Sequence, residues 1–179
     1  MRRYLKILFL WFFGLAALWT VFTYSVNPYD YWDVPRVENF NAIKPKLSRQ
    51  QAIAKPKQWA RLQPEIVILG NSRVQVGFNP NSSVWQGQRV YNAGFPGLDL
   101  MGQLRALERV SDISSLRRIY VGVDFLDFRI SENDWGKTSV PMGADGLFQS
   151  ARHYAELLWS SSAFADSLMT VFAQFQSGT

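Results

Sequence analysis

An uncharged apolar run near the N-terminus is the feature that most limits how this chain can fold. Residues 7–26 read ILFLWFFGLAALWTVFTYSV and contain no charged side chain. At about 1.5 Å of rise per residue, a helix of this length crosses the hydrocarbon core of a bilayer, which is about 30 Å thick. The run therefore predicts a single membrane-spanning helix, preceded by a short tail of residues 1–6.

The charges on either side of the run indicate its orientation. Arg2, Arg3 and Lys6 precede it, whereas Asp30 and Asp33 follow it. Positive side chains stay on the cytoplasmic side of a membrane, so the N-terminus is expected in the cytoplasm and the rest of the chain outside it. A cleaved signal peptide is the alternative, but its apolar region is shorter and ends at a small-residue cleavage site, which this run lacks. Both interpretations export the remainder of the chain.

The overall composition excludes several classes of function. The chain has no cysteine, which rules out a disulfide scaffold, a zinc–cysteine site and a cysteine nucleophile. Its net charge of +5 is not arranged as a basic stripe beside base-stacking aromatics, so we expect no nucleic-acid partner. No metal-ligand spacing and no phosphate-binding glycine loop is present, and no cofactor or metal is expected.

Residues 27–60 are interpreted as a juxtamembrane connector. Prolines at 28, 35, 45 and 56 are expected to interrupt any long helix. A short helix is predicted at residues 48–54, with Ser48 as its N-cap. The lysines and arginines between residues 44 and 61 are expected to be solvated, close to anionic lipid headgroups.

Residues 61–179 are predicted to form an α/β domain. Nearly continuous apolar segments alternate with a helical pattern, which is typical of a parallel sheet. The predicted strands are 65–69, 89–93 and 118–125, and the helix between the last two is 99–111, with Asp99 as its N-cap. A polar loop at 131–146 and two helices at 147–159 and 163–175 follow.

Parallel sheets bind ligands just beyond the carboxyl ends of their strands. Ser72 follows the first predicted strand, with Asn71 and Arg73 on either side of it and Gly70 permitting a sharp turn. A serine exposed on such a turn is a candidate nucleophile. The alternative is a turn serine that only satisfies local backbone groups.

The other two strand ends carry further candidates. Asn92 lies near the end of the second strand and Gly94 directly follows it, where a side-chain amide and a backbone N–H can stabilise an oxyanion. Their alternative role is structural, with Asn92 bracing a glycine-rich loop. Asp124 follows the third strand, and its alternatives are a cap or an ion pair with Arg73 or Arg129.

These segments resemble the conserved blocks of the SGNH (GDSL-type) hydrolases. ILGNSR at 68–73 is similar to the first block, VYNAGFPG at 90–97 to the second, and GVDF at 122–125 falls where the third places Gly-x-Asn-Asp. The combination is most similar to membrane-anchored bacterial proteins of surface-polysaccharide acylation. The resemblance implies a flavodoxin-like parallel sheet, Ser72 as nucleophile, Gly94 as oxyanion donor, a periplasmic domain on the inner membrane, and a glycan or acyl donor as partner.

Two departures limit what the resemblance implies. Asp124 is a carboxylate where the family has an amide, and an ionised carboxylate donates no hydrogen bond to an oxyanion. The family's Asp-x-x-His pair is also missing, because the only histidine, His153, has Ser150 three residues before it. We therefore expect an incomplete SGNH-like sheet, an N-terminal portion of a longer protein, whose esterase or acyltransferase activity needs an Asp and a His from further sequence.

Two other functions remain open at this point. One is a non-catalytic module that keeps the α/β fold and binds a glycan or scaffolds a membrane complex. The other is a small membrane-anchored interaction protein whose aromatic connector and C-terminal helices mediate assembly.

Overall fold

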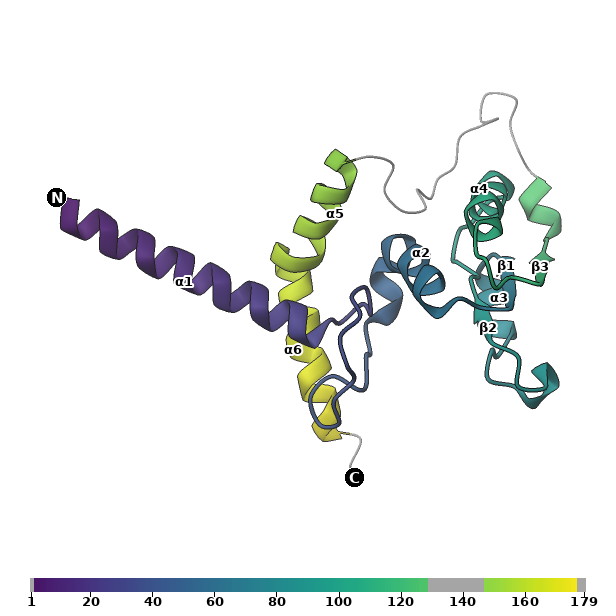
Figure 1. Ribbon diagram of the computed structural model, residues 1–179, viewed down its shortest axis with the longest axis horizontal. Helices are drawn as coiled ribbons and strands as arrows, with labels where there is room; N and C mark the ends of the chain where they lie inside the picture. The colour runs from purple at the N-terminus through teal and green to yellow at the C-terminus, as the bar shows by residue number, and fades with distance from the viewer. Residues whose placement is uncertain (1, 129–146, 177–179) are drawn as a thin grey trace. The chain divides into compact units, whose positions relative to one another are not determined.

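The computed structural model describes residues 2–128 and 147–176, which form two compact units (Figure 1). The first unit holds the described residues up to Gln50 together with residues 147–176. The second unit holds residues 51–128. The predicted polar loop at 131–146 lies outside the described residues.

The first unit is built on three helices, α1 (Arg2–Val26), α5 (Leu147–Trp159) and α6 (Ser161–Gln176). Helix α1 is long and apolar enough to span a membrane, as predicted from residues 7–26. Helices α5 and α6 contact α1, where the Trp19 ring lies 4.4 Å from the Phe164 ring. Both predicted C-terminal helices are confirmed, and their apolar aromatic contacts join them to the end of α1.

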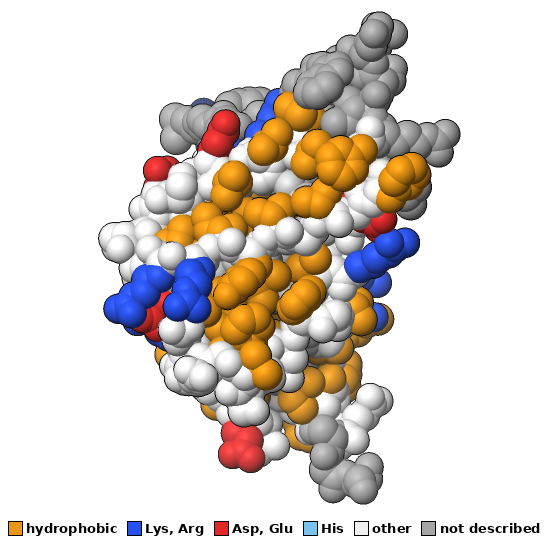
Figure 2. Space-filling model, turned by 90° about the vertical axis from the view of Figure 1, so that its right-hand side faces the viewer, with side chains coloured by type: hydrophobic (Ala, Val, Ile, Leu, Met, Phe, Trp, Pro, Cys, Tyr) orange, Lys and Arg blue, Asp and Glu red, His pale blue; other side chains and the backbone are white. Residues whose placement is uncertain are grey.

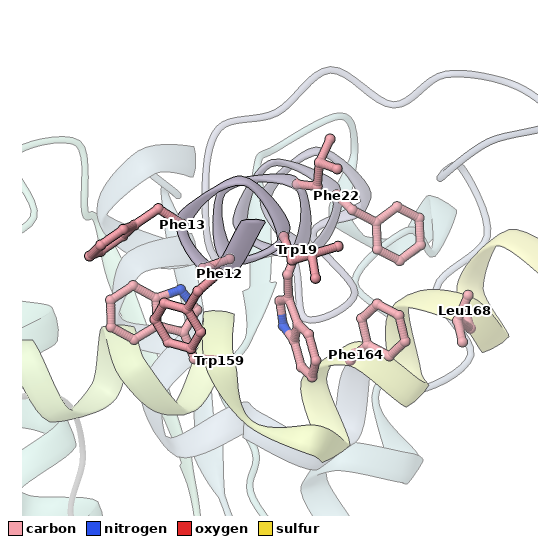
Figure 3. Close-up of a pocket in the computed structure, with 10 residues that line it drawn as sticks. Phe12, Phe13, Trp19, Phe22, Trp159, Phe164 and Leu168 are labelled. Carbon is pink, nitrogen blue, oxygen red and sulfur yellow. The ribbon is translucent and has the colours of Figure 1, made fainter. Parts of the chain in front are cut away.

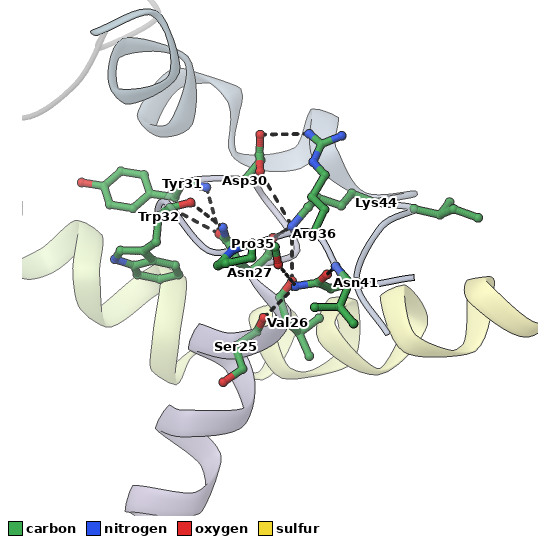
Figure 4. Close-up of polar contacts among 12 residues, drawn as sticks. Ser25, Val26, Asn27, Asp30, Tyr31, Trp32, Pro35, Arg36, Asn41 and Lys44 are labelled. Atoms are coloured by element: carbon green, nitrogen blue, oxygen red, sulfur yellow. Dashed lines mark hydrogen bonds and ion pairs between the residues drawn. The ribbon is translucent and has the colours of Figure 1, made fainter. Parts of the chain in front are cut away.

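The C-terminus of α1 is capped by side chains from the segment that follows it (Figure 4). The last carbonyls of a helix have no partner within the helix. Here Lys44 Nζ donates to the carbonyls of Val26 (3.3 Å) and Asn27 (2.6 Å), and Asn41 Nδ2 donates to that of Ser25 (3.0 Å). The expectation of a solvated Lys44 is wrong, because only 3% of its side chain is exposed.

A buried carboxylate joins α6 to the same segment. Asp166 is fully buried and accepts hydrogen bonds from the Tyr29 hydroxyl (2.9 Å) and from Arg49 (2.8 Å). Burial and the Asp166 carboxylate raise the pKa of Tyr29 above its usual range, so this phenol stays protonated. The connector predicted at residues 27–60 therefore contributes side chains, including Tyr29 and Arg49, that are hydrogen-bonded within the first unit.

The second unit is an α/β fold around a parallel sheet. In chain order it contains α2 (Gln51–Leu62), β1 (Ile66–Gly70), α3 (Ser72–Gly77), β2 (Val90–Asn92), α4 (Leu100–Ser111) and β3 (Arg118–Gly122). The three strands lie in the order β2-β1-β3, and both pairings are parallel. The predicted strands and parallel sheet are confirmed, as is Asp99 as the N-cap of α4, whose carboxylate accepts from the Gly102 N–H at 2.7 Å.

The central strand β1 is buried on both faces. Val67 and Leu69 face one cluster, built with apolar residues of α2, β2 and α4, such as Trp59 and Ala106. Ile66 and Ile68 face the other side, where Val74 of α3 covers them. Strand side chains alternate between faces, so burial of both faces requires an apolar residue at every position of β1.

Strand β3 differs from this pattern. Its side chains are partly exposed, including Tyr120 and Val121, each 45% exposed. Within the described residues β3 pairs only with β1 and forms an edge of the sheet. The face turned to the viewer in Figure 2 carries many hydrophobic side chains. An apolar, partly exposed edge strand is typical of a surface that another element covers.

The segment around Pro56 also departs from expectation. A 3₁₀ turn, η1 (Leu47–Gln50), contains Ser48, and α2 then runs through Pro56 to Leu62. Ser48 is therefore not an N-cap, and Pro56 does not end the helix. Proline lacks the N–H that would bond the carbonyl four residues earlier, so α2 tolerates one missing hydrogen bond.

Candidate functional site

The strand order creates a topological switch point at the carboxyl edge of the sheet in the second unit. Strand β2 lies on one side of β1, and the chain then crosses to place β3 on the other side. Ligands of parallel α/β sheets bind at such a switch point, beyond the carboxyl ends of the strands. All the candidate residues predicted from the sequence follow these three strand ends.

Ser72 is the first residue of α3, directly beyond the central strand. Asn71 is the N-cap of this helix, and its side-chain oxygen accepts from the Arg73 N–H at 3.0 Å. The helix lies close against the sheet because Val74 packs over Gly70 and Gly122, where a Cβ atom on either glycine would collide with its side chain. This packing leaves Ser72 exposed at the carboxyl edge of the sheet.

The Ser72 hydroxyl has no base beside it in the part of the chain that the structure describes. Among residues 2–128 and 147–176, no side chain accepts a hydrogen bond from Ser72 Oγ. The single histidine, His153, lies on α5 in the other unit. A serine hydroxyl is a weak nucleophile until a base removes its proton. The described residues therefore include the candidate nucleophile but no base that would activate it.

Asn92 and Gly94 are bound to each other and to α3. The Asn92 amide donates to the carbonyls of Val74 (3.0 Å) and Phe78 (2.7 Å), which lie at the end of the helix. Its oxygen accepts the Gly94 N–H at 2.9 Å. The bracing role that the sequence left open for Asn92 is therefore seen, and the Gly94 N–H has a partner in this conformation.

Gly94 also sets how closely α3 approaches the loop after β2. A Cβ atom at this position would lie 2.5 Å from the backbone nitrogen of Gln75. Real Cβ atoms do not come this close to backbone, so only glycine fits. The glycine at 94 thus has a packing reason that is independent of any oxyanion.

Asp124 forms an ion pair with Arg73. The pair joins the segment after β3 to the start of α3, and the Asp124 side chain is 14% exposed whereas that of Arg73 is 72% exposed. This is one of the alternatives that the sequence left open. A carboxylate paired with a guanidinium offers acceptors rather than donors to a ligand.

Sequence reasoning missed Asp127, which connects the strand ends. Its carboxylate accepts from Asn71 Nδ2 (3.3 Å), from Gln103 Nε2 (3.1 Å) and from the Asp124 N–H (2.7 Å). Asp127 is buried, with 9% exposed. One sequence pattern could have indicated this role, namely the D-x-x-D spacing of Asp124 and Asp127. In a capping box, the side chain of the second residue of such a pair accepts a hydrogen bond from the backbone N–H of the first.

Gln103 completes this network from α4. Its side chain is 2% exposed, and its Oε1 atom has no hydrogen-bond partner among the described residues. A buried acceptor without a partner costs free energy, and such atoms concentrate at strained or functional places. Asn71, Gln103 and Asp127 therefore form a polar network beside the carboxyl ends of β1 and β3.

Lys55 was also missed, and it lies behind the loop after β2. Its ammonium donates to the carbonyls of Asn92 (3.3 Å) and Gly94, and the residue is 8% exposed. Burial lowers the pKa of Lys55 to about 8, because desolvation disfavours the charged form. The expectation of a solvated lysine is wrong for Lys55. Its buried side chain holds this loop in place through hydrogen bonds to two of its carbonyls.

Three features thus lie at the carboxyl edge of the sheet. They are the exposed Ser72 hydroxyl, the Arg73–Asp124 ion pair and the hydrogen-bonded loop after β2. No group of three or more metal-ligating side chains is found among the described residues. Comparisons of the chain with protein-family models, with curated proteins and with solved structures found no match. The function is therefore argued from the site and from the sequence resemblance alone.

Proposed function

We propose that this chain is an exported, membrane-anchored protein of SGNH type, whose second unit carries out ester hydrolysis or acyl transfer on a cell-surface glycan through Ser72. The observation that carries the proposal is the place of Ser72, which is exposed as the first residue of α3, two residues after the end of the central strand, at the switch point of a parallel sheet. This is where α/β sheets bind their ligands.

The sheet order supports a flavodoxin-like assignment. Doubly wound sheets of that type have the order 2-1-3-4-5, and the first three strands here lie in the order β2-β1-β3. The sequence blocks after the three strands match those of SGNH hydrolases in order and place. We propose that further strands would extend the sheet from β3, whose apolar side chains are partly exposed.

Membrane anchorage rests on α1. It is the helix long and apolar enough to span a membrane, with basic residues before its apolar run and acidic residues after it. By the positive-inside rule we place the N-terminus in the cytoplasm and the catalytic unit in the periplasm of a bacterium, with α1 in the inner membrane. A glycan on the cell surface would then be within reach of Ser72.

In the proposed reaction, Ser72 Oγ attacks the acyl carbonyl carbon while a general base takes the hydroxyl proton and the carbonyl oxygen becomes an oxyanion. The oxyanion collapses and breaks the ester bond, and the leaving alcohol takes the proton from the base, which leaves the acyl group on Ser72. Water or a glycan hydroxyl then attacks this acyl-serine by the same steps and frees Ser72. The base comes from outside the described part of the second unit. The Gly94 N–H would have to leave Asn92 Oδ1 to bind the oxyanion, since it is engaged in the described conformation. Arg73 beside Ser72 supplies a cation that favours an anionic group at this edge.

Fluorophosphonate labelling of the protein in its own membranes tests the proposal. We expect a covalent adduct on Ser72 that Ser72→Ala abolishes and that Ser83→Ala retains, because Ser83 is an exposed serine away from the strand ends. An adduct that survives Ser72→Ala, or none on any serine, would remove the catalytic assignment.

A second function is favoured by the hydrogen bonds at the oxyanion position. The Gly94 N–H is already bonded, Asp124 is paired with Arg73, and no described side chain activates Ser72. Under this alternative the unit binds a glycan without chemistry, or scaffolds a membrane complex. Retention of the chain on a glycan matrix that is equal for the native protein and Ser72→Ala, with no labelling, would establish it.

A further inference from the structure

Helix α6 has an inverted distribution of side chains. The residues it buries are mostly polar, and Asp166, Ser167 and Thr170 are each 0% exposed. Its exposed side chains include Met169 (47%), Phe172 (63%) and Phe175 (68%). A helix of a water-soluble unit buries its apolar stripe and exposes its polar one. The outer face of α6 therefore suits a hydrocarbon environment better than water.

An apolar groove runs between α1 and the α5–α6 pair in the same unit (Figure 3). It has a volume of about 1060 Å³. Its lining residues are Phe12, Phe13, Leu15, Ala16, Leu18, Trp19, Phe22, Trp159, Phe164 and Leu168. Every one of these side chains is apolar or aromatic, so a ligand for the groove has to be apolar as well.

The two indole N–H groups at the groove are already engaged. Trp19 Nε1 donates to the Leu158 carbonyl at 2.8 Å, and Trp159 Nε1 donates to Thr20 Oγ1 at 2.8 Å. Neither donor is left for a polar ligand. Both bonds also fasten α5 to α1, so the groove has fixed walls on two sides.

The position of the groove along α1 sets its depth. Trp19 lies twelve residues beyond Ile7, the start of the apolar run, which corresponds to about 18 Å of helix. If α1 spans the bilayer, this point lies just beyond the midplane of the hydrocarbon core, which is about 30 Å thick, and the groove residues of α1 from Phe12 to Phe22 lie on both sides of that midplane. The groove residues of α1 then face acyl chains.

The chemistry of the walls distinguishes a lipid from a second protein. Membrane helices pack through small residues and interhelical hydrogen bonds. Of the groove residues only Ala16 is small, and the others are bulky. Such walls cannot bring two helix backbones close together, whereas a flexible acyl chain adapts to them.

We propose that the groove-lining side of the α5–α6 pair lies beside α1 within the hydrocarbon core, and that the groove holds an acyl chain of a membrane phospholipid. The proposal rests on the proposed membrane insertion of α1, but it is independent of any chemistry at Ser72. It assigns to the first unit a lipid-binding role in addition to anchorage.

A photo-crosslinker at one groove residue tests the proposal in the full chain. Benzoyl-phenylalanine is placed at Leu168, which lines the groove on α6, or at Arg152 as the control, which is exposed and paired with Glu156 on α5. Membranes are irradiated, the protein is purified, and its intact mass is measured. Alkaline extraction of the same membranes reports separately whether α1 is inserted.

We expect a mass gain of one phospholipid at position 168 and none at position 152. Filling the groove with Ala16→Trp should reduce the adduct at least fivefold, whereas Leu8→Trp, at an exposed position of α1 outside the groove, should leave it unchanged. A protein-sized adduct at 168 would identify a partner helix and overturn the proposal, as would no adduct in a chain that resists extraction. Release of the chain by alkali would show that the membrane anchorage itself fails.

Discussion

Asn71 donates a hydrogen bond from its Nδ2 to the buried carboxylate of Asp127 at 3.3 Å, and this bond joins the end of β1 to the turn after β3. The same Asn71 caps the helix that begins with Ser72. Asp127 therefore acts on the candidate nucleophile indirectly, because it orients the residue that precedes it.

Removing the Asp127 carboxylate should destabilise the second unit. In Asp127→Ala the amides of Asn71 and Gln103 lose their acceptor, and the buried Gln103 donor has no water to replace it. We expect a loss of about 2 kcal/mol in the opening free energy of β1 and β3. Hydrogen exchange with mass spectrometry measures it for this unit. Asp112→Ala, at an exposed carboxylate, should change it little, and equal effects of the two variants would contradict the role of the network.

The buried Lys55 should make stability rise with pH. Its pKa is lowered to about 8 in the folded state from an ordinary value of 10.5. Between these values the unfolded state binds more protons than the folded one, so the free energy of unfolding increases with pH. A shift of this size corresponds to about 3 kcal/mol across the interval.

Urea unfolding at several pH values between 7 and 11, followed by near-UV circular dichroism, measures this dependence. Lys55→Met should abolish the rise, because no group with a lowered pKa remains at that position. Lys57→Met, at an exposed lysine two residues along the same helix, should retain it. An unchanged pH slope in Lys55→Met would show that the ammonium is not desolvated.

Gly94→Ala should disturb the contact between α3 and the loop after β2. The added methyl would lie 2.5 Å from the Gln75 nitrogen, which is backbone and cannot rotate away. We expect a destabilisation of about 2 kcal/mol, measured as a lower urea midpoint. Gly77→Ala serves as the control, since a Cβ there meets nothing within 4 Å. A neutral Gly94→Ala would mean that α3 shifts freely on the sheet.

Asp166→Ala should loosen the segment that follows α1. The substitution removes the acceptor of both the Tyr29 hydroxyl and Arg49, and Tyr29 is only 1% exposed. We expect the free energy of unfolding of the first unit to fall by about 2 kcal/mol. This is less than the loss expected for a fully buried ion pair, because the Arg49 side chain is half exposed. Proteolysis of residues 27–50 in detergent should become faster. Glu38→Gln, at an exposed carboxylate, should leave the cleavage rate as it is.

Much of the second unit was predictable because its signals are local. These signals are the apolar segments at β1 and β3, the Asp99 cap and Gly70 at the end of β1. Each depends only on residues close to it in the sequence. The exposed place of Ser72 followed from treating these segments as a parallel sheet, whereas the strand order β2-β1-β3 came only from the structure. Asp127 was not predictable with the same reasoning, because its partners Asn71 and Gln103 are far from it in sequence.

The sequence by itself determined the apolar helix, the three strands, the parallel sheet and the position of Ser72, since periodicity and capping depend on neighbouring residues. Only the tertiary structure decided which polar side chains are buried. Lys44 and Lys55 were predicted to be solvated, yet the ammonium group of each donates hydrogen bonds to backbone carbonyls of distant segments. Helix α6 was predicted only as a helix, and the structure shows that it buries Asp166 and exposes Phe172. Burial depends on what packs against a residue, and that is fixed by contacts between residues far apart in the chain.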